Sequence, residues 1–292
     1  ELFINVMREA PKMKVIVNAD DSLTSYIALE SGNEVIPYGI NENVLEGKTS
    51  HEMHEGHFCR KCGGTLEYEF YHYSQLGKYA CSSCDFKRPE VMFNASEIHV
   101  GEQLKFTVGD RKIVANYKGF YNVYNILAVY SALQSANIPD EHFDEVLLSY
   151  NPGNGRMENF EINGTKILLN LAKNPAGFNQ NIAAVLQDES PKDIILQVND
   201  KPQDGIDVSW LWDIDFDDLK DANIQSITVC GMRRYDLGLR LKYVDIPAVV
   251  DGDVEHAIRH AIDHGCGNLY VLVNFTPLMD TRAVIKKLEG QK

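Results

Sequence analysis

The sequence predicts an α/β fold in two domains, the second of which is a Rossmann-like, doubly wound parallel sheet. Three observations predict it. Apolar runs of strand length alternate with helical segments along the second half, the order that gives parallel sheets. The length of 292 residues suits two domains of ordinary size. A content of 44% hydrophobic and 24% charged residues is typical of a folded globular protein.

Charge and hydropathy exclude other classes of function. The formal net charge of −14 repels polyanions, so we expect no nucleic-acid partner. No apolar run reaches the roughly 18 residues that cross a bilayer, and residues 1–21 lack the pattern of a signal peptide. We therefore expect a cytoplasmic protein, in which disulfides are disfavoured. The first residue is not Met, and we expect part of a longer protein to precede it.

The first half predicts strands with polar residues at their ends. Residues 14–21, KVIVNADD, have the pattern of a buried strand that ends in a polar turn, where α/β proteins bind ligands. A capped helix over residues 25–29 and a short strand over residues 32–40 are expected next. Three more strands and two helices complete this half. These strands are residues 95–100, 104–108 and 111–116, and the helices are residues 122–137 and 138–150.

The segment NPGNG, residues 151–155, is the strongest break in the pattern and predicts the domain boundary. We expect residues 1–150 to form one domain and residues 151–292 the other. Beyond the boundary, strands and helices alternate in the order of a doubly wound sheet. The expected strands are residues 166–172, 193–199, 226–231, 246–250 and 268–275, and the expected helices are residues 177–186, 216–222, 237–243, 256–264 and a last segment ending at residue 288.

Four of the six cysteines form two C-x-x-C pairs, Cys59 with Cys62 and Cys81 with Cys84. The eighteen residues between the pairs fit a four-cysteine zinc site, and part of them alternates like a hairpin strand of a zinc ribbon. Because four thiolates leave no open coordination position, we expect a structural zinc in an insertion at about residues 57–90. Two disulfides or a redox pair are the alternatives, which the expected compartment disfavours.

The remaining histidines and cysteines of interest have simpler interpretations. Four histidines lie near the cysteine pairs, and we expect most of them at the surface, although a histidine ligand in place of one cysteine is an alternative. Cys230 and Cys266 lie in apolar contexts, which predict small buried residues and not nucleophiles. The four histidines are His51, His54, His57 and His72.

Three polar stretches call for a common explanation. The first is the NADD turn at residues 18–21. The second is GFYNVYN, residues 119–125, which opens a helix and places Asn122 and Asn125 on one face, at the helix end that favours phosphate. The third is GRMENFEINGTKILLNLAKNPAG, which places Arg156 just after the boundary and a polar turn after the next strand. Each stretch alone is also explained as a helix cap or a solvated turn.

The order of these stretches resembles the Mur ligase family, whose ATP-dependent members form amide bonds in the peptidoglycan stem peptide. The family's central ATPase domain has an N-x-D-D strand end and a G-x-H-N-x-x-N helix start, and a G-R-x-E turn opens its last domain. The resemblance implies that residues 1–150 are an incomplete central ATPase domain with the zinc ribbon inserted. It also implies ATP and Mg²⁺, with Asn122 and Asn125 facing the nucleotide, Arg156 its phosphates or ribose, and Asp236 the ribose.

The chain departs from the family pattern at three residues and one loop. Tyr121 stands where the family has His, and Asn170 and Lys173 stand where it has Asp and His. No G-x-x-G-K-[ST] phosphate loop occurs in the sequence, and we expect that loop upstream. The resemblance therefore implies only part of an ATP site here, to which Arg240 is a weaker candidate contributor.

The ribbon and the carboxy-terminal sequence narrow the resemblance to the branch that amidates lipid II. This branch implies conversion of the second-position D-glutamate to D-isoglutamine at the inner face of the cell membrane, with ammonia from a GatD-type class I glutaminase. The implied docking element follows the strand at residues 193–199, with Trp210 and Trp212 in it. Asp200 directly follows the strand, and we expect it to orient the histidine of the glutaminase. The other acids there are Asp204 and Asp207, and turn acids beside buried tryptophans are the simpler alternative.

Two other functions remain as alternatives. The first is a ligase that adds an amino acid, as ordinary Mur enzymes or folylpolyglutamate synthase do, which Asn170, Lys173 and the ribbon disfavour. The second is a non-catalytic zinc-ribbon protein that binds nucleic acid or another protein, and the net charge disfavours nucleic acid. Dependence on glutamine and a glutaminase tests the first alternative, and ATP binding tests the second.

Overall fold

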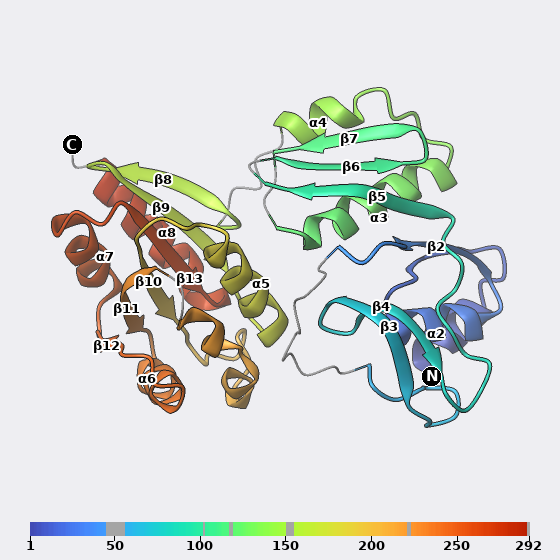
Figure 1. Cartoon of the computed structure of the whole chain (residues 1–292), viewed down its shortest axis with the longest axis horizontal. Helices are drawn as coiled ribbons and strands as arrows, with labels where there is room; N and C mark the ends of the chain where they lie inside the picture. Colours follow the sequence, from blue (N-terminus) through green and yellow to red (C-terminus); the bar gives the residue numbers. More distant parts are fainter. Residues whose placement is uncertain (45–55, 102, 117–118, 150–154, 221–222, 291–292) are drawn as a thin grey trace. The chain divides into compact units, whose positions relative to one another are not determined.

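The computed structural model of the protein forms two compact units, Glu1–Tyr150 and Asn151–Lys292 (Figure 1). Each unit contains its own central sheet and its own hydrophobic core. The mixed α/β class that the sequence predicts is confirmed. The structure describes residues 1–44, 56–101, 103–116, 119–149, 155–220 and 223–290.

The first unit is built on a five-stranded sheet. In pairing order its strands are β1 (Lys14–Asn18), β2 (Glu34–Ile40), β5 (Phe93–Val100), β6 (Leu104–Val108) and β7 (Arg111–Ala115). The first three are parallel to one another, and the last two continue the sheet antiparallel. Helix α3 (Tyr121–Ser135) buries Val123, Ile126 and Leu127 against this sheet, as its helical spacing of apolar residues predicts.

Three further helices complete the first unit, α1 (Leu2–Arg8), α2 (Ser22–Ser31) and α4 (Phe143–Ser149). Helix α2 begins directly after β1, where the carboxylate of Asp21 accepts a hydrogen bond from the backbone N–H of Leu23 at 3.1 Å. It ends at Gly32, whose φ of 76° lies in the left-handed region that glycine adopts without strain. The capped helix predicted after the first strand is therefore confirmed, and it is longer than predicted at both ends.

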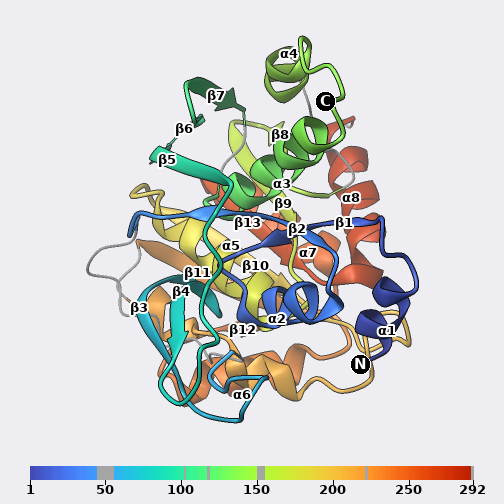
Figure 2. The ribbon, with the colours of Figure 1, turned by 90° about the vertical axis from the view of Figure 1, so that its right-hand side faces the viewer.

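An inserted hairpin separates β2 from β5 in the sequence. It consists of β3 (Leu66–Tyr73) and β4 (Leu76–Cys81), which pair antiparallel with each other and with no other strand of the described residues. Residues 57–90, called the ribbon below, contain this hairpin and both cysteine pairs. Figures 1 and 2 show the hairpin beside α2, and the rings of Tyr26 and Phe86 make an edge-to-face contact across that junction with centroids 5.9 Å apart.

The second unit is built on a six-stranded sheet. In pairing order its strands are β12 (Val249–Val250), β11 (Ile224–Cys230), β10 (Lys192–Gln197), β13 (Asn268–Val273), β9 (Thr165–Leu171) and β8 (Glu158–Ile162). Five strands are parallel, which confirms the doubly wound arrangement, and β8 lies antiparallel at the edge. The sequence prediction missed β8. Its turn to β9 is Asn163-Gly164, with φ values of 51° and 85°.

Helices cover both faces of this sheet (Figure 1). One core contains residues of α5 (Pro175–Leu186) and α6 (Arg234–Tyr243), and the other contains residues of α7 (Val254–Asp263) and α8 (Phe275–Glu289). Alternation along β10 divides its side chains between them, because Ile194 and Leu196 join the first core and Ile195 joins the second. All three are nearly fully buried, as expected for a central parallel strand.

In place of the α-helix predicted over residues 216–222, the structure has the 3₁₀ helix η2 (Phe216–Leu219), and another 3₁₀ helix, η1 (Ser209–Asp213), precedes it. Residues 221 and 222 lie outside the described ranges. Two observations agree with an irregular helix here. Aspartates, which favour turns, are frequent in the segment. The carbonyl of Ile214 accepts from the backbone N–H of Phe216 at 2.9 Å and from the guanidinium of Arg240 at 2.8 Å, in place of an α-helical bond.

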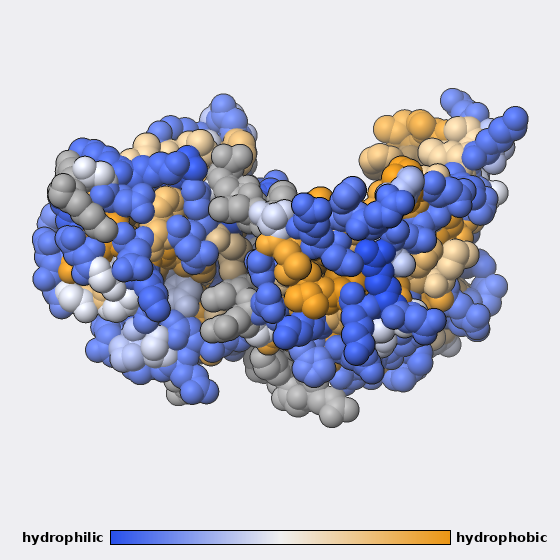
Figure 3. Space-filling view, turned by 90° about the horizontal axis from the view of Figure 1, so that it is seen from above, coloured by the Kyte–Doolittle hydropathy of each residue, from blue (hydrophilic) through white to orange (hydrophobic). Residues whose placement is uncertain are grey.

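The surface is consistent with the acidic composition. The face drawn in Figure 3 is largely hydrophilic, with hydrophobic residues gathered in patches. Within the described ranges, no helix has both the length and the apolar character needed to span a membrane.

Candidate functional site

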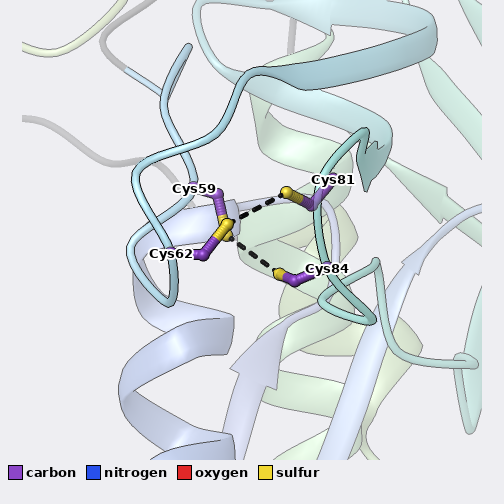
Figure 4. Close-up of side chains that lie close together, drawn as sticks. All are labelled: Cys59, Cys62, Cys81 and Cys84. Carbon is purple, nitrogen blue, oxygen red and sulfur yellow. Dashed lines mark hydrogen bonds between the residues drawn. The ribbon is translucent and has the colours of Figure 1, made fainter.

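The four cysteines of the ribbon lie together (Figure 4). Their Sγ atoms all lie within 4.8 Å of one another, with 3.7 Å between those of Cys59 and Cys84 and 3.5 Å between those of Cys62 and Cys81. Four sulfurs bound to one tetrahedral zinc ion at about 2.3 Å are separated by about 3.8 Å, whereas a disulfide requires about 2.05 Å. The donor atoms and their spacing therefore fit a zinc ion.

Backbone amides point at two of these sulfurs. Gly64 N lies 3.4 Å from the Sγ of Cys62, and Ser83 N lies 3.3 Å from the Sγ of Cys81. The Ser83 amide lowers the pKa of the Cys81 thiol to about 7. The amide of Phe86 lowers the pKa of the Cys84 thiol, but desolvation and the other thiols outweigh it and raise the value to about 12. Four thiols without a cation thus do not ionise together, and a bound zinc ion would supply the charge that allows it.

The NADD turn and the start of helix α3 meet in the structure. Tyr124 donates its hydroxyl hydrogen to Oδ2 of Asp20 at 2.7 Å, across 104 positions of sequence. On either side of Tyr124, the side-chain amide of Asn125 donates to Oδ1 of Asn122 at 3.2 Å. The two asparagines therefore share one face at the amino-terminal end of α3, where the helix dipole favours negative charge.

Asp20 is fully buried at the centre of a polar network. Besides Tyr124, the backbone N–H of Ile40 donates to its Oδ2 at 2.9 Å, and the Nε of Arg88 donates to its Oδ1. The guanidinium of Arg88 also donates to the carbonyl of Ile40 at 3.2 Å and to Oδ1 of Asn41 at 2.8 Å. Arg88 belongs to the ribbon, and sequence reasoning missed it, because its local context does not distinguish it from an exposed arginine.

His72 is an exception to the surface positions expected for most of the ribbon histidines, because it is only 2% exposed. Its Nδ1 lies 2.6 Å from the hydroxyl oxygen of Tyr124, and its Nε2 lies 2.8 Å from the carbonyl oxygen of Glu42. Alternation along β3 explains the burial, since every second residue of that strand points inward. His57 is exposed, and His51 and His54 lie outside the described residues.

We expect the first unit to lose stability as the pH falls from 7.5 to 5.5. Burial lowers the pKa of His72 below its ordinary 6.5, with Asp20 and Glu42 opposing this effect and Arg88 reinforcing it. The unfolded chain then binds the proton more tightly, so stability is present above pH 6.5 and falls below it, by at most about 1.4 kcal/mol per pH unit. Urea unfolding at both pH values measures this.

The control for this pH dependence is His142, which is exposed on the same unit. Replacing His72 by Gln should reduce the difference between the two unfolding free energies. Replacing His142 by Gln should leave it nearly unchanged. An identical pH dependence in the His72→Gln variant and the unsubstituted protein would contradict the assignment.

In the second unit, polar side chains join the carboxyl ends of three neighbouring strands. After β10, Asn199 donates its backbone N–H to Oδ1 of Asn274, after β13, at 2.9 Å, and Asn274 donates back to the Asn199 carbonyl at 2.7 Å. The backbone N–H of Met232, after β11, donates to Oδ1 of Asn199 at 2.9 Å. This edge of a doubly wound sheet is where ligand sites form.

Asp200 lies next to this junction. The guanidinium of Arg233 donates to its Oδ2, and the Asp200 side chain is only 15% exposed. This bond raises the pKa of Arg233. The other oxygen, Oδ1, is buried and has no hydrogen-bond partner in the described part of the chain. Asp200 is thus an oriented carboxylate with one acceptor atom left unused.

The two other aspartates of this loop have local roles. Asp204 accepts hydrogen bonds from the backbone N–H of Thr276 at 2.8 Å and of Lys201 at 3.2 Å, which tie the loop to the start of α8. Asp207 is exposed and accepts from the backbone N–H of Ser209 at 2.8 Å, which lowers its pKa. Asp204 also accepts from the hydroxyl of Thr276. Of the three, Asp200 is the one that an arginine side chain holds.

Asp236 and Arg240 lie on α6 and have different surroundings. Asp236 is in the first helical turn, 46% exposed, with its Oδ2 3.6 Å from Nη1 of Arg233. Arg240 is buried, with its guanidinium near the rings of Trp212 and Phe216 at 5.8 Å and 5.7 Å. Arg240 therefore serves the packing of η1 and η2, and Asp236 is the more accessible of the two.

The two charged residues of the GRME turn, Arg156 and Glu158, have different surroundings. Arg156 is exposed and has no ion-pair partner among the described residues. Glu158 is instead held by Arg282 of α8 in a two-point ion pair of 2.7 Å and 2.8 Å, which lowers the pKa of Glu158. Arg156 thus remains accessible to a ligand, and Glu158 holds β8 against α8.

Asn170, which stands where the Mur ligase pattern has Asp, is buried in a network of neutral amides. Its Oδ1 accepts from the backbone N–H of Met157 at 2.9 Å, and its Nδ2 donates to the side chain of Asn181. Asn181 in turn donates to the carbonyl of Gly177 at 2.9 Å. An aspartate at this position lacks the amide donor, so Asn170 has a structural use here. Lys173 is exposed.

The docking element contains one packed and one exposed tryptophan. Trp210 packs against the first core of the second unit, 5.7 Å from the ring of Phe178. Trp212 is 49% exposed and makes an edge-to-face contact with the exposed Tyr243 of α6. Exposed apolar residues recur along this element and α6. They are Ile206, Trp212, Met232, Tyr235, Leu239 and Tyr243.

Comparison with known proteins gives consistent matches. Residues 171–278 match the family described as MurT ligase C-terminal. A protein of Staphylococcus aureus (strain COL) named lipid II isoglutaminyl synthase (glutamine-hydrolyzing) subunit MurT is 34% identical over 268 residues, which are 91% of this chain and 60% of that protein. The subunit of the same name from Streptococcus pneumoniae is 26% identical over 97% of this chain and 64% of its own. The chain thus spans about three fifths of the curated relatives it matches.

Solved structures of low sequence identity share the fold. A pseudomurein peptide ligase type C from Methanothermus fervidus matches with a TM-score of 0.70 and 23% identity, over 98% of this chain and 59% of that one. MurF ligase from Thermotoga maritima in complex with ADP matches with a TM-score of 0.56 and 13% identity, over 97% of this chain and 55% of that one. The predicted Mur ligase architecture, with a partial central domain and a Rossmann-like last domain, is confirmed. The sequence matches along nine tenths of its length are to proteins named subunit MurT, and residues 171–278 match the MurT ligase C-terminal family.

Proposed function

We propose that the protein is the ATP-dependent ligase subunit of a glutamine-hydrolysing amidotransferase. It amidates the D-glutamate of the lipid II stem peptide to D-isoglutamine, working in the cytoplasm at the inner face of the membrane. The observation that carries the proposal is the contact of Tyr124 with Asp20, which brings the NADD turn and the asparagine-bearing start of α3 to one place in a Mur ligase fold. The names of the relatives support the substrate.

The reaction needs activation because a carboxylate is a poor electrophile. Transfer of the terminal phosphoryl group of ATP to a carboxylate oxygen gives an acyl phosphate and ADP. Ammonia then adds to the carbonyl carbon, and the tetrahedral intermediate expels phosphate to leave the amide. Mg²⁺ would neutralise charge on the phosphates during the transfer.

The residues of this chain supply part of the nucleotide site. Asn122 and Asn125 face the nucleotide from the amino-terminal end of α3, where the helix dipole also favours negative charge. Arg156, which lies just before β8, contacts its phosphates or ribose, and Asp236, in the first turn of α6, contacts the ribose. The side chain of Arg156 is exposed and that of Asp236 is about half exposed. The match covers 60% of the relative from Staphylococcus aureus, and the proposal assigns the rest of the site to the part of such proteins that this chain does not cover.

Free ammonia must come from a partner that docks against the second unit. The exposed apolar residues along the Asp200 loop and α6 are of the type found in protein interfaces. A GatD-type class I glutaminase seated there would bring its catalytic Cys and His toward Asp200. Asp200, which the guanidinium of Arg233 holds in place, is the carboxylate that we propose for that histidine. The zinc ion of the ribbon is structural in this proposal and takes no part in the reaction.

The test uses the full-length protein that contains this chain, together with a GatD-type glutaminase. We expect amidated lipid II, detected by mass spectrometry, only when ATP, glutamine and both subunits are present. Product formation from a free amino acid without the glutaminase would support an amino-acid-adding ligase instead. Absence of any nucleotide binding by the full-length protein would support a non-catalytic ribbon protein.

Replacing Asn125 by Ala should raise the KM for ATP about tenfold, because one hydrogen bond at the nucleotide is worth about 1.4 kcal/mol. The KM for glutamine should not change. Val129 is exposed on the same helix outside its first turn, so Val129→Ala is the matched control and should leave both constants unchanged. Equal KM values for ATP in Asn125→Ala and the unsubstituted protein would remove Asn125 from the site.

A further inference from the structure

The ribbon has a second role, which follows from the buried network around Asp20. We propose that Arg88 and His72 position the NADD turn and the start of α3, which face the nucleotide. The folded four-cysteine site thereby controls nucleotide affinity without contacting the nucleotide. This inference rests on the proposed function in one respect, namely that Asn122 and Asn125 face the nucleotide. Arg88 and His72 lie in the ribbon, outside the N-x-D-D, G-x-H-N-x-x-N and G-R-x-E motifs of the ligase family.

The first argument is the number of contacts that converge on the NADD turn from the ribbon. The backbone N–H of Gly77 donates to the carbonyl of Asp20 at 2.9 Å, and Leu76 makes an isolated β-bridge with Asp21. The side chain of Gln75 donates to Oδ1 of Asp21 at 3.3 Å. The β3–β4 turn therefore holds the backbone of this strand end, independently of the side-chain network.

The second argument is that the ribbon reaches α3 through side chains. His72 contacts the hydroxyl of Tyr124, and Arg88 contacts the carboxylate that the same hydroxyl bonds. Tyr124 lies between Asn122 and Asn125 in the first helical turns. Its hydroxyl is thus held by Asp20 and by His72 of the ribbon, and Arg88 of the ribbon holds Asp20 in turn.

The third argument is steric. Gly39 of β2 leaves the space that Arg88 and Asp20 occupy, since a Cβ at residue 39 would lie 2.8 Å from both the Nη2 of Arg88 and the Oδ1 of Asp20. Such a contact is far inside van der Waals distance, so no larger residue fits without displacing the pair. The sheet is therefore built to admit the ribbon arginine.

The fourth argument connects Arg88 to the cysteines. The backbone N–H of Cys81 donates to the carbonyl of Phe86 at 2.8 Å, and the N–H of Arg88 donates to the carbonyl of Tyr79 at 3.0 Å. Residues 82–86 form the second cysteine turn between these two bonds. A change in that turn therefore moves the backbone that carries Arg88, and with it the partner of the buried Asp20.

Loss of Arg88 would leave a carboxylate buried without its cation, which is strongly unfavourable. Asp20 would then lose the partner that orients its carboxylate, and the hydrogen bond that it accepts from the hydroxyl of Tyr124 would weaken. We therefore expect the start of α3 to become more mobile and the nucleotide to bind more weakly. This defines Arg88 as a positioning residue, since it is not placed at the nucleotide itself.

The experiment compares Arg88→Met with Lys87→Met in the full-length protein bound to its glutaminase. Lys87 is the exposed neighbour of Arg88, so its substitution is the matched control. For Arg88→Met we expect one zinc per chain, a dissociation constant for ADP raised about tenfold by calorimetry, and a KM for glutamine that does not change. Arg88→Lys should recover part of the affinity. Hydrogen exchange of residues 119–125 should be faster in Arg88→Met, and faster in the unsubstituted protein after zinc chelation.

Several outcomes separate this inference from the proposed function. An unchanged ADP affinity in zinc-loaded Arg88→Met overturns the inference alone. If the unsubstituted protein binds no ADP, the proposed function fails and the inference fails with it. Should Arg88→Met not fold, Tyr124→Phe serves in its place, because it keeps the buried ring and removes only the hydroxyl. Unchanged ADP affinity and unchanged exchange of residues 119–125 in Tyr124→Phe also overturn the inference.

Discussion

Replacing Asp200 by Asn should lower the rate of glutamine-dependent amidation by about 10,000-fold in the proposed complex of the full-length protein with a glutaminase. The magnitude is that of losing the acid which orients a catalytic histidine, where an amide holds the wrong tautomer. Asn keeps the size of the side chain, so the loop after β10 remains folded. The expected loss appears in the hydrolysis of glutamine itself, measured as glutamate release, while ADP affinity remains unchanged.

The geometry gives this prediction two internal checks. Asp263→Asn makes the same chemical change at an exposed position at the end of α7, and it should leave glutamate release unchanged. Arg233→Met removes the cation that holds Oδ2 of Asp200. The carboxylate remains but is less well oriented, so we expect the rate of glutamate release to fall by about tenfold to 100-fold. Normal glutamine turnover in Asp200→Asn would refute the role of Asp200.

The parallel strands of the second unit were predictable because each is a short apolar run between helical segments. Strand β8 was not recognised, although its sequence ENFEI alternates and an Asn-Gly turn follows at residues 163–164. That turn signal is strong for a hairpin. Glu158, which stands at the acid of the G-R-x-E pattern, is the first residue of this strand. The structure shows Glu158 bound to Arg282 of α8.

The side chains that connect motifs could not be predicted from the sequence in the same way. The zinc site could be predicted, because the two C-x-x-C pairs are visible in the sequence. The structure brings the sulfurs of Cys59 and the other three cysteines together. The pairing of Arg88 with Asp20 has no such pattern, because it depends on where the ribbon packs. His72 lies between these cases, since the alternation along β3 indicates its inward position but gives no partner. Local periodicity thus predicts burial, and tertiary packing decides which buried polar groups meet.

Replacing Cys81 by Ser removes the zinc that we expect at about one ion per chain. A structural zinc contributes its binding free energy to folding, about 10–16 kcal/mol in isolated zinc-finger peptides. The ribbon has only a small core, with Leu66, Tyr79 and Phe86 as its buried members besides Cys59, so it is not expected to stay folded without the metal. A loss of even 3 kcal/mol lowers the melting temperature of a unit of this size by about 10 °C. Elemental analysis and thermal unfolding measure the two effects.

The matched control is Cys266→Ser in the second unit. The Sγ of Cys266 donates to the carbonyl of Asn268 at 2.9 Å, and a serine hydroxyl donates in the same way, so zinc content and melting temperature should not change. Two disulfides and no metal in the purified protein would refute the zinc site. The separations of 3.5 Å and 3.7 Å argue against that outcome, because they approach the spacing around a tetrahedral ion. Each bonded pair would have to close by about 1.5 Å to form a disulfide, and amides that now point at sulfur would lose their acceptors.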